Sequence, residues 1–208
     1  MAKYTGPVCR LCRREGQKLF LKGERCMTDR CSIDRKSYPP GQHGQRRSKL
    51  SEFAIQLREK QKVKRVYNVL ERQFRNIFKK ASQTKGVTAD IFFRNLELRA
   101  DNVVFRMGFA RSRAEGRQVV RHNHILLNGK RMNIPSATLK LGDTVTVEAT
   151  SAKDGKFALA ADLFKKRPVP PWVAVDHESF SGKVTALPTR DDIQLQVKER
   201  LIVELYNK

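Results

Sequence analysis

Four cysteines near the start of the chain are the residues with the clearest capacity for chemistry. They are Cys9, Cys12, Cys26 and Cys31, so a C-x2-C pair is followed, after thirteen residues, by a C-x4-C pair. A C-x2-C turn directs two thiolates at one ion, and a second pair completes a tetrahedron. The spacing predicts a structural Zn2+ site, with an iron–sulfur cluster as the less favoured occupant. A closed four-thiolate site leaves no position for a reacting water, so zinc catalysis is not expected.

Two alternatives stay open at this site. Four reduced thiols without a metal would suit a reducing cytosol, and His43 could substitute for one thiol ligand. Zinc is favoured because residues 1–50 are rich in Arg, Gly and Pro and cannot bury a core of their own. A bound metal would supply the order that this segment lacks.

Positive charge dominates the composition: 43 Lys and Arg stand against 21 Asp and Glu, for a formal net charge of +22. A compact protein with this charge repels itself unless a polyanion compensates it. Nucleic acid is the commonest polyanion, and an anionic membrane surface is the alternative. We expect a cytoplasmic protein without a membrane anchor, because no signal peptide is recognisable and no apolar run approaches the roughly 18 residues of a spanning helix.

Basic side chains in the first half of the chain form two candidate phosphate-contacting groups. One interleaves with the cysteines and the following Gly- and Pro-rich stretch, where guanidinium groups fixed by a metal could meet phosphates bidentately. The other lies along a helix expected over residues 51–81, where acidic residues are too few to balance it. A basic disordered tail and a solvated helix face are the respective alternatives. The candidates are Arg10, Arg13, Arg14, Arg46, Arg47, Lys49, Arg58, Lys62 and Arg65.

A third candidate group lies in the middle of the chain. Arg113, Arg117 and Arg121 are spaced i, i+4 and i+8, so they share one stripe of an expected helix. Like charges on one stripe repel each other, which favours phosphate contact over an ordinary solvated face. The other members of this group are Arg111, His122, His124, Lys130 and Arg131.

Local signals around this third group predict two helices followed by a hairpin and a strand. Helices are expected over Arg99–Met107 and from Ser112 to about His122, the second opened by a capping box formed by Ser112 and Glu115. Asn123 should end it in the left-handed region, and Asn128-Gly129 predicts a type I′ hairpin turn. Further helices are expected over Thr88–Leu98 and Asp191–Val197. Strands are expected at Lys130–Ile134, Thr144–Glu148, near Val173–Val175, and at the alternating residues Leu201, Val203 and Leu205.

No pattern in the chain predicts catalysis. The four histidines have no recognisable nucleophile beside them, and no Gly-rich phosphate loop is present. The pair Asp191-Asp192 suits a helix N-terminus better than a metal site. We therefore expect neither an enzyme nor a small-molecule substrate.

Several of these stretches resemble the family of bacterial small-subunit ribosomal protein four, including its small RNA-binding module. The resemblance covers nearly the whole chain. The stretches that carry it are Tyr4–Gly16, Tyr38–Gly44, Leu57–Arg65, Asp101–Val104 through Asn128-Gly129, Asn133–Ser136 and Ile202–Tyr206.

The resemblance implies an α+β fold in three parts. A zinc-bound basic arm spans residues 1–50, and zinc occurs in some members of the family and not in others. An all-helical domain spans residues 51–97 and is completed by residues 177–208. Inserted between them, residues 98–176 form a helix-helix-hairpin RNA-binding module with a β extension and a small mixed sheet.

The resemblance also implies a function and partners. The chain would be a structural constituent of the small ribosomal subunit in the cytoplasm, and a primary binder of 16S ribosomal RNA. It would nucleate assembly of the subunit body, contribute to translational accuracy and neighbour ribosomal proteins five and twelve. Two residues depart from the family pattern: Ala100 stands where a larger apolar residue such as Leu is expected, and Gly116 stands where Ala is usual, at a helix-propensity cost of about 1 kcal/mol.

Two other functions compete with this one. An RNA-modifying enzyme such as a pseudouridine synthase can carry the same module, but it needs a catalytic domain with a reactive Asp, and no segment is left to house one. A zinc-dependent DNA-binding regulator needs a recognition helix aimed at base edges and a dimer interface. The sequence offers a distributed basic surface instead.

Overall fold

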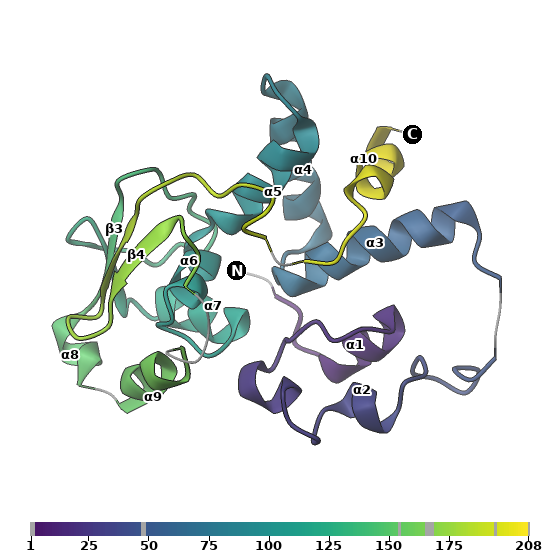
Figure 1. The fold of residues 1–208 in the computed structure, drawn as a ribbon, viewed down its shortest axis with the longest axis horizontal. Coiled ribbons are helices and arrows are strands. Elements are labelled where there is room, and N and C mark those ends of the chain that lie inside the picture. The colour runs from purple at the N-terminus through teal and green to yellow at the C-terminus, as the bar shows by residue number, and fades with distance from the viewer. Residues whose placement is uncertain (1–2, 47–48, 154, 165–168, 194, 208) are drawn as a thin grey trace. The chain divides into compact units, whose positions relative to one another are not determined.

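The computed structural model describes residues 3–46, 49–153, 155–164, 169–193 and 195–207 (Figure 1). The chain forms two compact units, one of Met1–Ala89 with Leu195–Lys208 and one of Asp90–Gln194. The second unit is thus inserted into the first. The return to the helical unit was expected at residue 177, whereas residues 177–193 belong to the second unit, because a strand at Ser181–Val184 pairs within its sheet.

The arm of the first unit is built from three short helices: α1 (Cys9–Glu15), the 3-10 helix η1 (Gly23–Cys26) and α2 (Ser32–Arg35). Its buried side chains are few: three of the cysteines with Leu19 and Ile33. The arm therefore has only a small apolar core, in line with the sequence expectation.

The remaining helices of the first unit are α3 (Glu52–Val66), α4 (Glu71–Gln83) and α10 (Glu199–Asn207). Ser51 caps α3 as predicted, because its Oγ accepts the Ala54 N–H at 3.2 Å. The single helix expected over residues 51–81 is interrupted at Asn68, which has φ of 51°. The Val69 N–H then bonds the Lys64 carbonyl at 3.0 Å, which closes α3 with a left-handed C-terminal turn.

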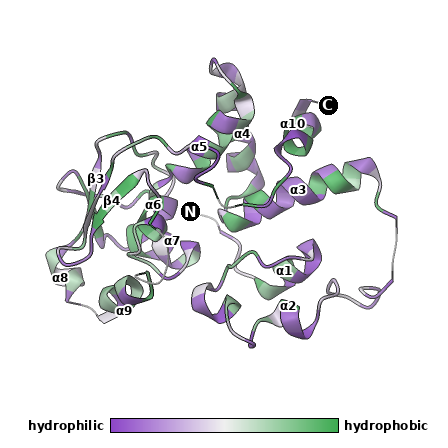
Figure 2. Ribbon diagram, viewed as in Figure 1, coloured by the Kyte–Doolittle hydropathy of each residue, from purple (hydrophilic) through white to green (hydrophobic). Residues whose placement is uncertain are grey.

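The C-terminal segment is helical, so the strand expected from Leu201, Val203 and Leu205 is a wrong prediction. In α10 the residues that pack inward are Ile202 and Tyr206, spaced i and i+4. The Tyr206 ring stacks on Phe78 with 4.6 Å between centroids. Hydrophobic and hydrophilic residues alternate along α3 and α10 (Figure 2), as expected for helices that bury one side. The short helix expected over Asp191–Val197 is not formed by its described residues.

Helix α5 (Thr88–Glu97) leads from the first unit into the second, which also contains α6 (Ala100–Arg106) and α7 (Arg113–Arg121). All three lie close to their predicted bounds. Helices α6 and α7 pack against each other. A Cβ on Gly116 would lie 2.6 Å from the Asp101 carbonyl oxygen. Glycine at this position therefore permits a close approach of the two backbones, which offsets its poor helix propensity. Ala100 is fully buried at the start of α6.

The sheet of the second unit has five strands among its described residues: β1 (Ile125–Leu127), β2 (Lys130–Arg131), β3 (Thr144–Val147), β4 (Val173–Asp176) and β5 (Ser181–Val184). Their order is β2-β1-β3-β5-β4, and each pair is antiparallel. The prediction of a mixed parallel and antiparallel sheet is therefore wrong. Short turns join β1 to β2 and β4 to β5, and short connections favour antiparallel neighbours.

The predicted hairpin turn is confirmed, because Asn128 and Gly129 have φ of 50° and 78°. Asn123 is also left-handed at 62°, as expected after α7. The second strand is shorter than predicted and ends at Arg131. Helices α8 (Ala149–Ala152) and α9 (Gly155–Phe164) were not predicted.

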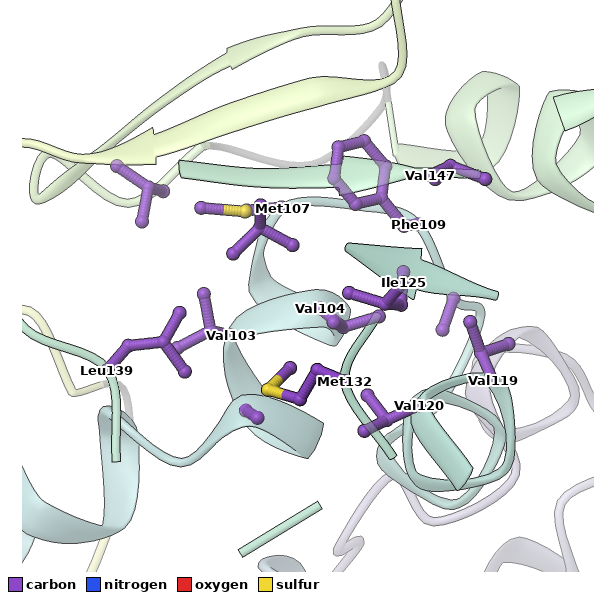
Figure 3. Close-up of a cluster of buried hydrophobic side chains, with 14 of the residues drawn as sticks. Val103, Val104, Met107, Phe109, Val119, Val120, Ile125, Met132, Leu139 and Val147 are labelled. Atoms are coloured by element: carbon purple, nitrogen blue, oxygen red, sulfur yellow. The ribbon is translucent and has the colours of Figure 1, made fainter. Parts of the chain in front are cut away.

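The core of the second unit lies between the sheet and the α6–α7 pair. Figure 3 shows Val104 of α6 and Ile125 of β1 pointing toward each other, with Val120 of α7 and Met132 nearby. These side chains belong to one buried apolar cluster. It fixes α7 and the β1–β2 hairpin in one rigid body. Among the described residues, no helix is both long and apolar enough to cross a membrane.

Candidate nucleic-acid interface

The side of α7 that faces α6 holds a buried ionic network, which we call the seam. Asp101 accepts hydrogen bonds from Arg99 at 3.0 and 2.8 Å and from Arg117 at 3.1 Å. Arg99 and Arg117 are only 2% and 5% exposed. Burial lowers the pKa of Arg117, and the Asp101 charge opposes that shift. Arg117 was expected to contact phosphate, and that expectation is wrong, because its guanidinium is enclosed and neutralised within the fold.

Arg113 belongs to the same seam. Its Nε donates to Asn102 Oδ1 at 2.7 Å, and its guanidinium lies 4.7 Å from the centroid of the Phe105 ring. Asn102 in turn donates to Glu97, which also accepts from Arg106 at 3.0 and 2.7 Å. Two members of the predicted arginine stripe therefore face α6. Of the three, Arg121 is the one that is exposed.

Exposed cationic side chains gather at the end of α7 and on the hairpin. We call Arg121, His122, Lys130 and Arg131 the outer face. Lys130 and Arg131 form β2, an edge strand whose residues are both exposed. The Arg131 side chain is 68% exposed although it pairs with Glu148. These groups can meet an external polyanion without leaving their places in the fold.

Beside the outer face is a hollow of about 270 Å³. Its lining is Arg111, Glu115, Gln118, Val119, His122, His124 and Lys156. Glu115 binds Arg111 twice, through the Arg111 N–H at 2.7 Å and the guanidinium at 2.9 Å. The capping box thus differs from its prediction: Ser112 Oγ accepts the Glu115 N–H at 3.3 Å, but Glu115 reaches the residue before the cap. Sequence reasoning missed Lys156, because α9 has no local signal that relates it to α7.

Basic residues of α3 that were expected to contact RNA are instead balanced within the first unit. Glu15 of α1 accepts hydrogen bonds from Arg58 at 3.2 Å and from Arg65. Lys62 bonds Glu59 at 2.5 Å. These cations are half-buried, and the side chain of Glu15 is fully buried. The expectation that α3 lacks acidic partners was wrong, because the partner Glu15 lies 43 positions from Arg58 and 50 positions from Arg65 in the sequence.

The remaining predicted contacts of the arm divide by exposure. Arg13 is held within the arm, since its Nε donates to the Tyr38 carbonyl at 3.0 Å and its guanidinium lies over the Tyr38 ring. Arg47 lies outside the described residues. The predicted residues that stay exposed here are Arg10, Arg14, Arg46 and Lys49.

The four cysteines are free thiols, three of them buried and Cys9 half-buried. The Lys22 N–H donates to Cys26 Sγ at 3.4 Å. Burial raises the pKa of Cys12 and of Cys26, and nearby thiols add to both shifts. Across the described parts of the chain, however, no cluster of three or more His, Cys, Asp or Glu is arranged to hold a metal ion. His43 is exposed.

Two family models together match residues 3–145 of the chain, and full-length relatives match all of it. Residues 3–97 match the ribosomal protein S4/S9 N-terminal domain, and residues 98–145 match the S4 domain. The chain is 55% identical to small ribosomal subunit protein uS4 of Desulforapulum autotrophicum over 208 residues, which is 100% of both chains. It is 54% identical to the uS4 of Geotalea daltonii over 208 residues and 56% identical to that of Natranaerobius thermophilus over 209, again with full coverage of both chains.

Proposed function

Since this chain belongs to the S4 family of ribosomal proteins, we propose that it binds ribosomal RNA as a structural component of the small ribosomal subunit. The family is one of structural ribosomal proteins, and the chain is accordingly not an enzyme. The observation that carries the RNA-binding proposal is the outer face, where exposed cations stand on a rigid helix and hairpin.

The mechanism is electrostatic docking of a preformed surface. Lys and Arg side chains that neutralise phosphates release counterions, which supplies much of the affinity and makes it depend on salt. Because α7 and the hairpin share one apolar core, their cations keep fixed spacings. Such a surface reads the shape of a folded RNA more than its base sequence.

The proposed target is 16S ribosomal RNA, at a junction whose helices the two units hold together. By nucleating the folding of that junction, the protein would promote assembly of the subunit body and contribute to translational accuracy. Ribosomal proteins five and twelve are its proposed neighbours. The proposed location is the ribosome in the cytoplasm.

Filter binding of the full chain to 16S ribosomal RNA at several salt concentrations tests this proposal. We expect affinity to fall steeply between about 50 and 200 mM salt. Arg121→Gln and Lys130→Gln should each reduce the salt slope by about one. Lys183→Gln, on the exposed side of β5, is the matched control and should leave the slope unchanged. Affinity that does not respond to salt would contradict the proposal.

We also propose that the four cysteines bind one structural zinc ion. Four thiolates are the donor set that structural zinc prefers. Their burial without a disulfide, the Lys22 N–H···S hydrogen bond and the small core of the arm support this assignment. Cys9, Cys12, Cys26 and Cys31 would be the ligands, and zinc would supply folding free energy to the arm. An iron–sulfur cluster is the less favoured occupant.

Metal analysis of the purified chain tests the zinc proposal. We expect about one zinc per chain, and loss of that zinc in Cys31→Ser. The arm should then become sensitive to proteolysis, while Asp29→Asn, an exposed control nearby, should keep the metal. A metal content far below one ion per chain in the unmodified protein would refute the site, and iron with visible absorbance would favour the alternative occupant.

A further inference from the structure

The hollow beside α7 contains a hydrogen-bonded chain that fixes one histidine in its neutral form. Lys156 Nζ lies 3.3 Å from His124 Nε2, and His124 Nδ1 lies 2.7 Å from Ser151 Oγ. An ammonium can only donate, so Nε2 accepts. The ring proton is therefore on Nδ1 and is donated to Ser151. In this arrangement the ring carries one proton, on Nδ1, and Nε2 faces the Lys156 ammonium.

Several charged and titratable groups face His124 from the described elements around it. His122, after α7, has its ring 6.1 Å away between centroids. Glu148, after β3, donates its backbone N–H to the His124 carbonyl at 3.0 Å, while its carboxylate binds Arg131. On α9, Phe157 meets the ring edge-on. The carboxylate of the hollow, Glu115, is bound to Arg111.

The dimensions and chemistry of the hollow fit one phosphate group. Its volume of about 270 Å³ is below the roughly 300–1,000 Å³ of pockets that enclose drug-sized ligands. Lys156 and His122 can donate to an anion, His124 can do so once Nε2 is protonated, and Glu115 is engaged by Arg111. The hollow also adjoins the outer face through His122, which belongs to both.

We propose that the hollow binds one phosphodiester of the RNA and that His124 takes up a proton when it does so. This inference rests on the proposed RNA-binding function. The phosphate attracts the Lys156 ammonium away from His124 Nε2. Nε2 then takes a proton from solvent and donates it in a hydrogen bond to a phosphate oxygen, while the Nδ1–H remains on Ser151. No covalent bond changes other than the new N–H bond.

This coupling has a defined sign. Because the bound state holds one more proton than the free state, affinity rises as pH falls and is lost as pH rises. One proton gives at most about a tenfold change in the binding constant per pH unit. The pH dependence of the affinity should be observed near and above pH 6.5, where histidine ordinarily titrates. RNA binding driven by arginine alone has no pH dependence in that range.

The test is the affinity of the full chain for 16S ribosomal RNA between about pH 6 and 8.5 at constant salt, where histidine charge changes. For the unmodified protein we expect a several-fold rise in affinity per pH unit as pH falls. His124→Gln keeps an acceptor for Lys156 but cannot be protonated, so most of the pH dependence should disappear. His177→Gln, at a histidine of the second unit outside the lining of the hollow, is the matched control and should retain it.

A second variant keeps the proposal testable if His124→Gln does not fold. Lys156→Gln removes the competing cation, so His124 can be protonated before RNA arrives. We expect the pH dependence to shrink and the salt slope to fall by about one. A pH dependence that is unchanged in both variants, or a salt slope unaffected by Lys156→Gln, overturns the inference. Absence of salt-dependent binding by the unmodified protein would instead refute the proposed function itself.

Discussion

The seam and the outer face use arginines of one helix for opposite purposes. In the seam, Arg117 is buried and its charge is neutralised by Asp101. On the outer face, Arg121 is exposed one helical turn further along. The first cation stabilises the fold only while its carboxylate is present, whereas the second is available to a partner. Residue type and helical spacing are the same, so burial and the position of the acid decide the role.

The largest expected effect comes from breaking the seam. Asp101→Asn removes the negative charge that the buried Arg99 and Arg117 share, so we expect the second unit to lose about 3–5 kcal/mol of unfolding free energy. Chemical denaturation followed by circular dichroism would measure it. Asp191→Asn, at an exposed position of the same unit, is the control and should change little. A loss below about 1 kcal/mol would show that the seam charges are solvated.

A smaller loss is expected when the two helices of the seam are forced apart. In Gly116→Ala the new Cβ would meet the Asp101 carbonyl at 2.6 Å, and backbone must move to relieve it. We expect a net destabilisation of about 1–3 kcal/mol despite the better helix propensity of alanine. The same denaturation experiment measures this change. A gain in stability would mean that α6 and α7 separate without cost.

Substitutions on the outer face should weaken RNA binding while leaving the stability of the fold nearly unchanged. Arg121→Gln should change the unfolding free energy by less than about 0.5 kcal/mol, because exposed side chains contribute little to folding. It should nevertheless weaken RNA binding and lower the salt slope by about one. Denaturation and filter binding on the same preparation compare the two effects. Similar losses of stability in Arg121→Gln and Arg117→Gln would erase the distinction between the two regions.

A further small effect on stability is expected at a partly exposed cluster around Glu71 in the first unit. Glu71 accepts hydrogen bonds from Lys60 at 2.7 Å and Lys64 at 2.8 Å, and from Tyr206 of α10. Burial alone would raise the pKa of Glu71, but the two lysines lower it from 4.5 to about 2. A depressed pKa stabilises the folded state above pH 4.5, and this contribution is lost as pH falls toward 2.

Because the Glu71 side chain is 47% exposed, solvent screens these pairs and the contribution should stay below about 1 kcal/mol. Acid titration of stability in the unmodified chain and in Glu71→Gln measures it. The variant should lose the part of the acid dependence that lies between pH 4.5 and 2. Identical acid profiles would show that these ion pairs do not contribute to folding.

Local signals predicted the parts of this molecule that depend on neighbours in sequence. The Ser51 and Ser112 caps, the left-handed Asn123 and the Asn128-Gly129 turn each need only a few adjacent residues, and each is confirmed. Helix α8 was missed because it has only four residues and no side-chain cap. Helix α9 was missed because its apolar residues show no clear helical periodicity.

The candidate site was predicted less well because charge balance is a long-range property. The basic composition identified the polyanion, but it could not say which cations are balanced inside the fold. Arg58 and Arg65 are paired with Glu15, and Arg117 with Asp101, across sequence separations that no periodic pattern reports. Lys156 was missed for the same reason, because it lies beside His124 in the fold but 32 positions away in the sequence.

The insertion of one unit within the other sets an order of events during synthesis. Residues 90–194 are continuous, so the second unit can fold soon after it leaves the ribosome that makes it. Helix α3 cannot pack against α10 until α10 has been synthesised. The Gln56–Glu204 hydrogen bond between the two helices spans 148 positions. Closing that interval is easier once the inserted unit is compact, because it then acts as a short tether instead of a long flexible loop. The nascent helical unit therefore reaches completion only after the whole inserted unit and α10 have been synthesised.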